Sequence, residues 1–172
     1  IISSTSVGLE GQKFSASSTF SDSQVGQESS LTVQEDKKDG INKLFVVTTI
    51  GINHKPSAIL TVVFRIDDIV AAVQDYTGLG TTGETLVAAT DRNKNQISLF
   101  PLRFDTEGAL KKNLNSLSLA ETKDVTHSDV IDYRGKHVIA SVKNISISNW
   151  SMATKIDRDE ALGPISQLRD GL

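Results

Sequence analysis

The sequence predicts an α+β protein built mainly from antiparallel strands. The clearest signal is a pair of β-branched and aromatic runs of strand length at residues 43–50 and 58–66. Glycine, asparagine, proline and serine occur between them, at residues 51–57, and these turn-forming residues favour a hairpin. Apolar residues at helical spacing follow at residues 67–75, so helices connect the predicted sheets.

Three glycines, Gly78, Gly80 and Gly83, separate the first group of strands from a second group. Glycine enters turns with positive φ without steric cost, so this cluster predicts a sharp reversal of the chain. The spacing G-x-G-x-x-G also occurs in nucleotide-binding loops, which run from a strand through the glycines into a helix. Here a helix-like segment precedes the glycines and a strand-like one follows. We therefore interpret the cluster as a connector between two structural units.

The first group of elements begins with the tail of a strand at residues 1–4 and a Ser- and Gly-rich loop at residues 8–27. Predicted strands follow at residues 31–35, 43–50 and 58–66. Asp67 or Asp68 is expected to cap the helix at residues 67–75, because short polar side chains accept hydrogen bonds from the first free N–H groups of a helix.

The second group contains more strands and two helices. Strands are expected at residues 84–90 and 96–103, joined by a polar turn, and later at residues 130–133, 137–147 and 150–156. Between them, Leu110, Leu114 and Leu117 fall at i, i+4 and i+7, which predicts one face of a helix. Asp157 and Glu160 form a capping-box pattern that is expected to open the terminal helix.

Strands, a variable helical stretch, three further antiparallel strands and an exit helix follow one another in a PAS-like unit. The second group shows this order in full, and the first group lacks its opening strand and leading helix. The sequence therefore predicts one partial module at residues 1–75 and one complete module at residues 76–172.

Composition excludes several functional classes. The chain has 172 residues, of which 38% are hydrophobic, and a net charge of −3 with both signs mixed, so no basic face for nucleic acid is expected. It contains no cysteine, which excludes disulfides and thiolate metal sites.

The ends of the chain suggest an excised piece. We expect contact with a membrane only through segments outside this chain, because no apolar run is long enough to span a bilayer.

Three stretches of the sequence resemble the Cache family. They are Thr77-Gly-Leu-Gly-Thr-Thr-Gly-Glu-Thr-Leu-Val87, Asp132-Tyr-Arg-Gly-Lys136 and residues 149–165, which contain Asn149-Trp-Ser. Cache domains are PAS-like extracytoplasmic sensors of bacterial histidine kinases, diguanylate cyclases and chemoreceptors. The resemblance implies a double-Cache arrangement, in which residues 1–75 belong to a membrane-distal module and the exit helix runs toward the membrane.

Enzyme chemistry is not indicated. His54, His127 and His137 are far apart in sequence, and none has the helical spacing to a second His or Glu that metal pairs show. No serine lies in a G-x-S-x-G elbow. Paired carboxylates lie at predicted helix starts, where the helix dipole favours negative charge. We therefore predict no catalytic residue, no metal and no cofactor.

The sequence favours a ligand-binding pocket over an enzyme active site. Arg103, Tyr133 and Arg134 are the predicted contacts in the second module, because guanidinium groups beside an aromatic ring suit a carboxylate or another anion. The alternative is that Arg103 is an exposed strand-end residue and Tyr133 a packed turn aromatic. In the first module, Thr48 and Phe20 are weaker candidates, together with Phe14.

The predicted function is small-molecule sensing by the periplasmic part of a membrane-anchored bacterial signal transducer. The alternatives are a structural spacer or dimerisation module of such a receptor, and an enzyme. A homodimer is also considered, because Ala161, Ile165 and Leu168 form an apolar stripe on the terminal helix. Trp150 is expected to pack near the start of this helix and to couple its movement to that of the preceding strand.

Overall fold

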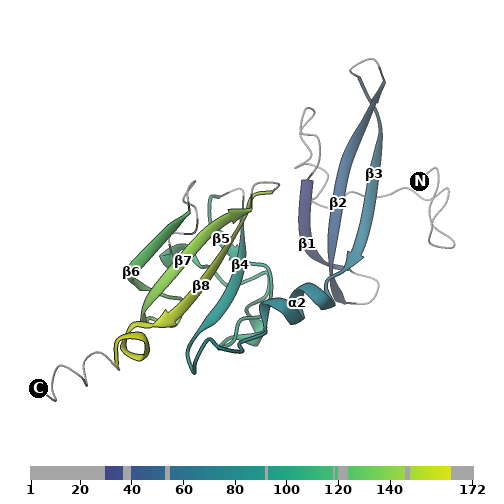
Figure 1. The fold of residues 1–172 in the computed structure, drawn as a ribbon. Coiled ribbons are helices and arrows are strands. Elements are labelled where there is room, and N and C mark those ends of the chain that lie inside the picture. The colour runs from purple at the N-terminus through teal and green to yellow at the C-terminus, as the bar shows by residue number, and fades with distance from the viewer. Residues whose placement is uncertain are drawn as a thin grey trace, which may run out of the picture. The chain divides into compact units, whose positions relative to one another are not determined.

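The computed structural model describes residues 30–36, 40–52, 55–91, 93–117, 119, 124–145 and 148–163. The chain divides into two compact units, one formed by Ile1–Thr32 and Phe45–Val63 and the other by Val33–Leu44 and Phe64–Leu172. Two sheets are present in the described residues, one of three strands and one of five (Figure 1). This confirms the predicted α+β class with antiparallel sheets, whereas the module boundary between residues 75 and 76 remains a prediction.

The three-stranded sheet has the strand order β1-β2-β3. Its strands are β1 (Ser30–Asp36), β2 (Ile41–Ile52) and β3 (Lys55–Arg65), so the three predicted strands are confirmed with small shifts of their ends. On β3 the neighbouring residues Val62 and Val63 are 39% and 48% exposed. Successive side chains of a strand point to opposite faces, so the described residues leave both faces of β3 open.

Helix α2 (Asp67–Val73) follows β3. Ile66 occupies the N-cap position, so the expectation that Asp67 or Asp68 would cap the helix is wrong. Both aspartates lie instead in the first turn, where the helix dipole favours them, and Asp67 accepts a hydrogen bond of 2.7 Å from Arg65 Nε.

The five-stranded sheet is antiparallel throughout, with the order β5-β4-β8-β7-β6. Its strands are β4 (Glu84–Thr90), β5 (Gln96–Ser98), β6 (Val125–Ile131), β7 (His137–Ile145) and β8 (Trp150–Asp157). The last strand in sequence, β8, thus lies in the middle of the sheet, between β4 and β7. Residues 158–163 are helical and follow β8 directly, as predicted for an exit helix.

The segment between β5 and β6 differs from the prediction. Its described residues contain two short 3-10 helices, η1 (Thr106–Gly108) and η2 (Asn115–Leu117), and Leu110 has a φ of 59°. Between these helices the backbone bonds to β5, with Leu110 N–H donating to Ser98 O at 2.8 Å and Leu114 N–H donating to Gln96 O at 2.7 Å. Pairing with the free edge of β5 therefore replaces the predicted leucine helix. The predicted strand at 96–103 ends early, at Ser98.

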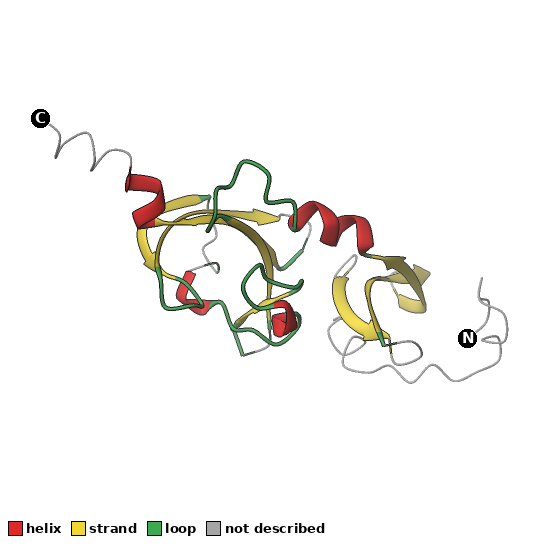
Figure 2. Ribbon diagram, turned by 90° about the horizontal axis from the view of Figure 1, so that it is seen from below, coloured by secondary structure: helices red, strands yellow, loops and turns green. Residues whose placement is uncertain are grey.

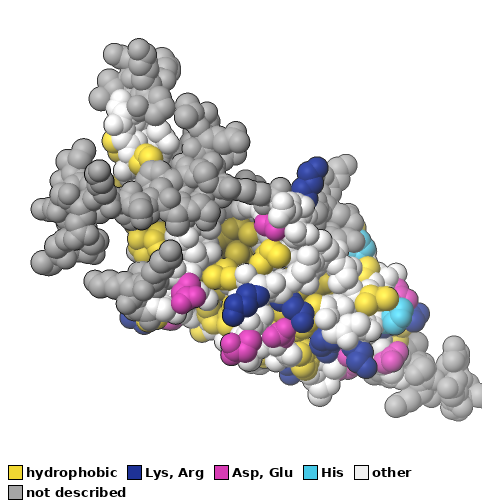
Figure 3. Space-filling view, turned by 180° about the vertical axis from the view of Figure 1, so that it is seen from behind, with side chains coloured by type: hydrophobic (Ala, Val, Ile, Leu, Met, Phe, Trp, Pro, Cys, Tyr) yellow, Lys and Arg dark blue, Asp and Glu magenta, His cyan; other side chains and the backbone are white. Residues whose placement is uncertain are grey.

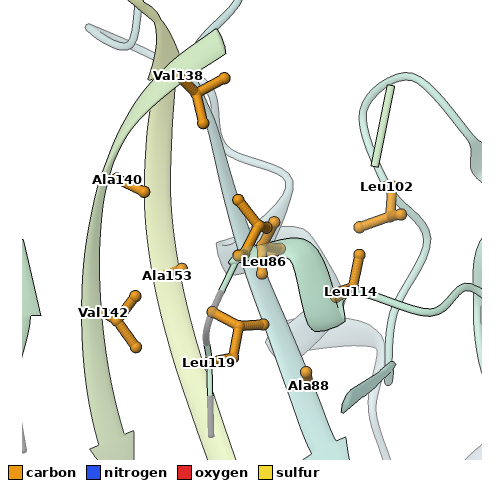
Figure 4. Packing of buried hydrophobic residues seen from close by; sticks show 10 residues of the cluster. Leu86, Ala88, Leu102, Leu114, Leu119, Val138, Ala140, Val142 and Ala153 are labelled. Atoms are coloured by element: carbon orange, nitrogen blue, oxygen red, sulfur yellow. The ribbon is translucent and has the colours of Figure 1, made fainter. Parts of the chain in front are cut away.

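The core of this unit lies between the sheet and that segment. Figure 2 shows the sheet curving around the loops and short helices of residues 99–117. In Figure 4, Leu102, Leu114 and Leu119 point from the segment toward Leu86 on β4. The cluster consists of buried aliphatic side chains, namely Leu86, Ala88, Leu102, Leu114, Leu117, Leu119, Val138, Ala140, Val142 and Ala153. The inner face of the sheet is therefore filled along its middle by aliphatic packing.

The surface carries charges of both signs. On the face drawn in Figure 3, Lys and Arg side chains alternate with Asp and Glu over the described residues. Charges of both signs are therefore mixed on this face. Within the described part of the chain, no helix is both long and apolar enough to cross a membrane.

Candidate functional site

A buried group of charges lies on the inner face of the five-stranded sheet, at the end where β4 begins and β8 ends. Glu84 and Lys155 face each other across β4 and β8, and their charged atoms, Oε2 and Nζ, are 2.9 Å apart. The Nζ atom of Lys155 is also 2.7 Å from Oδ2 of Asp132, which follows β6. The three residues are at most 3% exposed. We call Glu84, Asp132 and Lys155 the ion triad.

The turn between β6 and β7 holds two of the predicted ligand contacts beside the ion triad. Tyr133 donates its hydroxyl to the Glu84 carboxylate, at 2.8 and 3.0 Å from its two oxygens. Arg134 donates from Nε to Asp132 Oδ2 at 2.7 Å and forms an ion pair with Asp157 through Nη2. Asp132 also accepts the backbone N–H of Arg134 at 2.8 Å, which holds the turn in shape.

Arg103, the third predicted contact, lies at the same end of the module. Its backbone N–H donates to Glu84 Oε1 at 2.9 Å, and its guanidinium donates to the carbonyl oxygens of Gly80 and Gly83. The guanidinium carbon lies 4.6 Å from the ring centre of Tyr76 and 5.6 Å from that of Phe104. The structure thus brings Arg103, Tyr133 and Arg134 together, with their donors bound to groups of the protein itself. That they contact a ligand remains a prediction.

The proton affinities of these groups follow from burial and neighbouring charge. Burial raises the pKa of Tyr133 well above 10.0, and the negative charge and hydrogen bond of Glu84 add to this effect. For Asp132, burial would raise the pKa, but hydrogen bonds from Lys155 and Arg134 outweigh it, and the pKa falls below 3.8. At neutral pH Tyr133 is therefore a neutral phenol and Asp132 an ionised carboxylate.

This arrangement predicts how the two tyrosines of the chain titrate. Burial and the charge of Glu84 also raise the pKa of the partly exposed Tyr76 above 10.0, but the larger effect is on Tyr133, which should stay protonated in the folded protein at pH 10. A raised pKa in the folded state contributes stability below the unfolded value and loses it as the pH rises further. The phenolate absorbance of Tyr133 should therefore appear only together with alkaline unfolding. An ordinary ionisation near pH 10 that Tyr133→Phe abolishes would contradict the buried position of Tyr133.

The glycine cluster forms a loop that binds the exit helix. We call residues 78–83 the glycine loop. Thr81 N–H donates to Glu160 Oε1 at 2.7 Å and Thr82 N–H to Glu160 Oε2 at 2.8 Å. The hydroxyl of Thr82 donates to the same carboxylate and accepts the backbone N–H of Asp157 at 3.0 Å. The carboxylate of the first exit-helix turn therefore occupies a set of N–H and O–H donors on the loop.

These contacts correct the predicted capping box. The Glu160 carboxylate accepts hydrogen bonds from the glycine loop, and Asp157 forms an ion pair with Arg134. These partners replace the capping interactions that the sequence pattern predicts. Hydrogen bonds from the Thr82 hydroxyl and the Thr81 N–H lower the pKa of Glu160 to about 2. The carboxylate is consequently ionised at neutral pH. Its contribution to stability is present above about pH 4.5, the unfolded value, and is lost as the pH falls toward 2.

Two glycines make this close approach sterically feasible. Gly80 has a φ of 69°, and a Cβ atom added to it would overlap Oε1 of Glu160. A Cβ atom added to Gly83 would overlap the carbonyl oxygen of Leu79. The glycine signal in the sequence therefore marks a tight turn, as predicted, and also a binding surface for an acidic side chain of this same chain.

A surface cleft of about 580 Å³ lies beside these contacts. The glycine loop, the turn between β6 and β7 and the start of the exit helix line it, with Thr81, Thr82, Asp129, Gly135, Lys136, His137, Asp157, Arg158, Asp159 and Glu160. Two of these lining residues contact each other, with His137 Nδ1 2.6 Å from Asp129 Oδ1. Among the described residues, no three His, Asp or Glu side chains are placed to hold a metal ion.

The other sequence-predicted positions lie away from this site or outside the described residues. Phe14 and Phe20 lie outside the described residues, and Thr48 is a half-buried residue of β2 in the other sheet. Trp150 is at the start of β8, seven residues before Asp157, which is roughly 23 Å along an extended strand. It packs edge-to-face on Phe100, with ring centres 6.4 Å apart. The expectation that Trp150 supports the exit helix is therefore wrong.

The ion triad was missed at the sequence level, although a signal for it exists. Glu84 alternates with Leu86 and Ala88, and Lys155 alternates with Ala153, so both charges fall on the core-facing side of their strands. Opposite charges at inward positions of two strands indicate a buried pair. That signal requires knowing that β4 and β8 are neighbours, which the sequence order does not tell.

Comparisons with known proteins give the fold. No protein-family model and no curated protein matches the chain. Among solved structures, the ligand-binding domain of the Pseudomonas aeruginosa amino acid chemoreceptor PctB in complex with L-arginine matches with a TM-score of 0.54 and 15% identity, over 84% of this chain and 56% of that one. The periplasmic sensory domain of the Campylobacter jejuni chemoreceptor Tlp1 matches with a TM-score of 0.56 and 13% identity, over 83% and 57%.

The extracellular domain of the putative histidine kinase mmHK1S-Z2 also matches, with a TM-score of 0.56 and 16% identity, over 77% of this chain and 52% of that one. The chain thus spans about half the length of these structures. They are a ligand-binding domain, a periplasmic sensory domain and an extracellular domain, respectively. The comparisons confirm the predicted resemblance at the level of the fold: this chain has the PAS-like Cache fold found in the extracytoplasmic sensor domains of chemoreceptors and histidine kinases.

Proposed function

We propose that this chain is part of the extracytoplasmic sensor domain of a membrane-anchored signal transducer and that it senses a small molecule. The observation that carries the proposal is the direct continuation of β8 into the exit helix at residues 158–163, in a fold shared with ligand-binding sensor domains. Because β8 is the central strand of its sheet and continues into that helix, a rearrangement that moves β8 would also move the helix.

The proposed ligand class is a small carboxylate or another anion. Arg103 and Arg134 provide two guanidinium groups at one end of the module, and the guanidinium carbons lie 5.6 and 4.3 Å from the centre of the exposed Phe104 ring. Guanidinium forms two parallel hydrogen bonds with a carboxylate, so a ligand of this class can replace the protein's own acceptors, such as Asp157 on Arg134. Tyr133 would then lie beside the ligand. The same chemistry agrees with the L-arginine bound in the PctB structure.

Signalling would follow from differential binding. A ligand shifts the balance between two arrangements of the exit helix only by its preference for one of them, and a few kcal/mol is sufficient. A ligand present at about 100 times its Kd stabilises the form that it binds by about 2.7 kcal/mol. Such a gain is measurable as a thermal shift.

The test is a thermal-shift screen of the receptor's intact extracytoplasmic domain with amino acids and small carboxylates, compared among the wild type, Arg103→Met and Arg134→Met. The exposed Lys111→Met is the matched control for loss of a positive charge. We expect a concentration-dependent rise of the wild-type Tm that both arginine variants lose and Lys111→Met keeps. If the arginine variants bind normally, the two predicted arginine contacts are wrong while the sensing function stands. If no compound stabilises the wild type, the sensing function fails.

A structural spacer without its own ligand is the second candidate, and one observation favours it. The middle of the inner sheet face, where a PAS-like module can hold a ligand, is filled by the aliphatic cluster around Leu86 and Leu114 (Figure 4). A module packed in this way would transmit a conformational change that begins at a ligand site in another part of the receptor. In the same screen, a spacer predicts no stabilisation of the intact domain by any compound.

A further inference from the structure

The contact between Glu160 and the glycine loop joins two parts of the chain that lie far apart in sequence. The loop begins a few residues after α2 and leads into β4, and Glu160 lies in the first turn of the exit helix, 79 positions beyond Thr81. Both ends of the contact belong to the same compact unit. The chain that enters the five-stranded sheet is thus bonded directly to the helix that leaves it.

The glycine loop makes two sets of hydrogen bonds, one to Glu160 and one to Asp157. Glu160 accepts three hydrogen bonds from the loop, namely the N–H groups of Thr81 and Thr82 and the Thr82 hydroxyl. The same hydroxyl oxygen accepts the N–H of Asp157, the last residue of β8. Thr82 therefore bonds to both sides of the junction between strand and helix, so the loop cannot move without breaking bonds to the exit helix.

We propose that the glycine loop and Glu160 form a releasable latch, in which a carboxylate-binding loop holds a side chain of the exit helix and couples the helix to the chain entering β4. The latch lies at the edge of the surface cleft and Glu160 is only partly buried, so water and dissolved anions reach it. Its hydrogen bonds are charge-assisted, which makes them strong enough to hold and dependent on one side chain. The relevance of the latch for signalling rests on the proposed sensor function, whereas its existence does not.

Hydrogen exchange of backbone amides tests the latch in the chain itself. Glu160→Ala should speed exchange of the Thr81 and Thr82 amides by about tenfold or more, because both lose a charged acceptor. Thr82→Val keeps the size of the side chain and removes its hydroxyl, and it should speed exchange at Asp157 and in residues 158–163. Asp159→Ala changes an exposed acidic neighbour in the same helical turn and should affect neither region. If the loop and the exit helix are coupled, a change in the helix must affect the loop and a change in the loop must affect the helix.

Gly78 and Gly80 are a matched pair of positions that tests how closely Glu160 packs against the glycine loop. Gly78 and Gly80 both have positive φ, 79° and 69°, so alanine imposes similar backbone strain at each. Only at Gly80 would the added Cβ overlap Glu160, whereas nothing lies within 4 Å of a Cβ at Gly78. Gly80→Ala should therefore speed exchange in residues 158–163 and Gly78→Ala should not. In a Glu160→Ala background this difference between the two variants should vanish.

Rescue by a free carboxylate identifies the loop as a carboxylate site. Formate or acetate should restore protection of the Thr81 and Thr82 amides in Glu160→Ala in a concentration-dependent way, and chloride at equal ionic strength should not. The fluorescence of Trp150 should stay native in every variant, which shows that the module is folded. Equal exchange in Glu160→Ala and Asp159→Ala, or no response to formate or acetate, would overturn the latch. Neither result depends on whether the receptor binds a ligand, so the latch and the sensing function fail independently.

Discussion

Replacing Lys155 by methionine is expected to destabilise the five-stranded module by about 3–5 kcal/mol, the largest effect of any single substitution in the ion triad. The Nζ atom of Lys155 lies within 3 Å of both Glu84 and Asp132, and all three side chains are buried. Methionine fills the same space without a charge, so it leaves carboxylates in the interior without their main counter-ion. Denaturant unfolding followed by the fluorescence of Trp150, the single tryptophan of the chain, measures this loss.

Two further variants separate the charge effect from the loss of side-chain packing. Lys111→Met removes an exposed lysine and should change stability by no more than about 0.5 kcal/mol. The double variant Glu84→Gln with Lys155→Met removes one buried charge of each sign, leaves Asp132 paired with Arg134 and keeps an acceptor for Tyr133. It should recover most of the stability lost in the single variant. A double variant as unstable as Lys155→Met would show that lost packing, rather than unpaired charge, is the cause.

Leu114→Ala is expected to cost about 2–5 kcal/mol, because it opens a cavity in the aliphatic cluster. Leu114 is 0% exposed and comes from the segment that covers the sheet, where it faces Leu86 of β4 (Figure 4). Its backbone N–H also bonds to Gln96, so the surrounding chain is held in place and cannot easily collapse into the cavity. The same tryptophan-monitored unfolding provides the measurement.

The control is Leu162→Ala on the exit helix, where the leucine is 38% exposed. It removes the same atoms from a partly exposed position outside the aliphatic cluster, and it should cost about 1 kcal/mol or less. Similar losses for the two leucine variants would mean that residues 110–114 do not cover the sheet as described. Retained stability of Leu114→Ala would have the same meaning.

Elements with strong local signals were predicted well. The runs at residues 43–50, 58–66 and 137–147 became β2, β3 and β7, because β-branched residues in alternation favour a strand wherever it pairs. The glycine cluster became a turn with positive φ at Gly78 and Gly80. These predictions needed only information carried by neighbouring residues.

Elements that depend on partners distant in sequence were predicted poorly. The leucine spacing at 110, 114 and 117 fits a helix, but the free edge of β5 offered backbone hydrogen bonds that only the folded sheet reveals. Asp157 and Glu160 match a capping box, yet Arg134 and the glycine loop bind them instead. In each case a contact across the fold replaced the local interaction that the pattern suggests.

The sequence by itself determined the fold class, most strands, the glycine turn and the resemblance to sensor domains, since these depend on periodicity and on residues that act locally. It also named Arg103, Tyr133 and Arg134, which lie together in the structure. Only the tertiary structure decided what these residues bind. The antiparallel order β5-β4-β8-β7-β6 brings Glu84, Asp132 and Lys155 into one buried group, and the return of the exit helix to the glycine loop creates the latch. Burial and ion pairing are properties of neighbours in space, and the order of strands in a sheet, which sets those neighbours, is not contained in any local pattern of the chain.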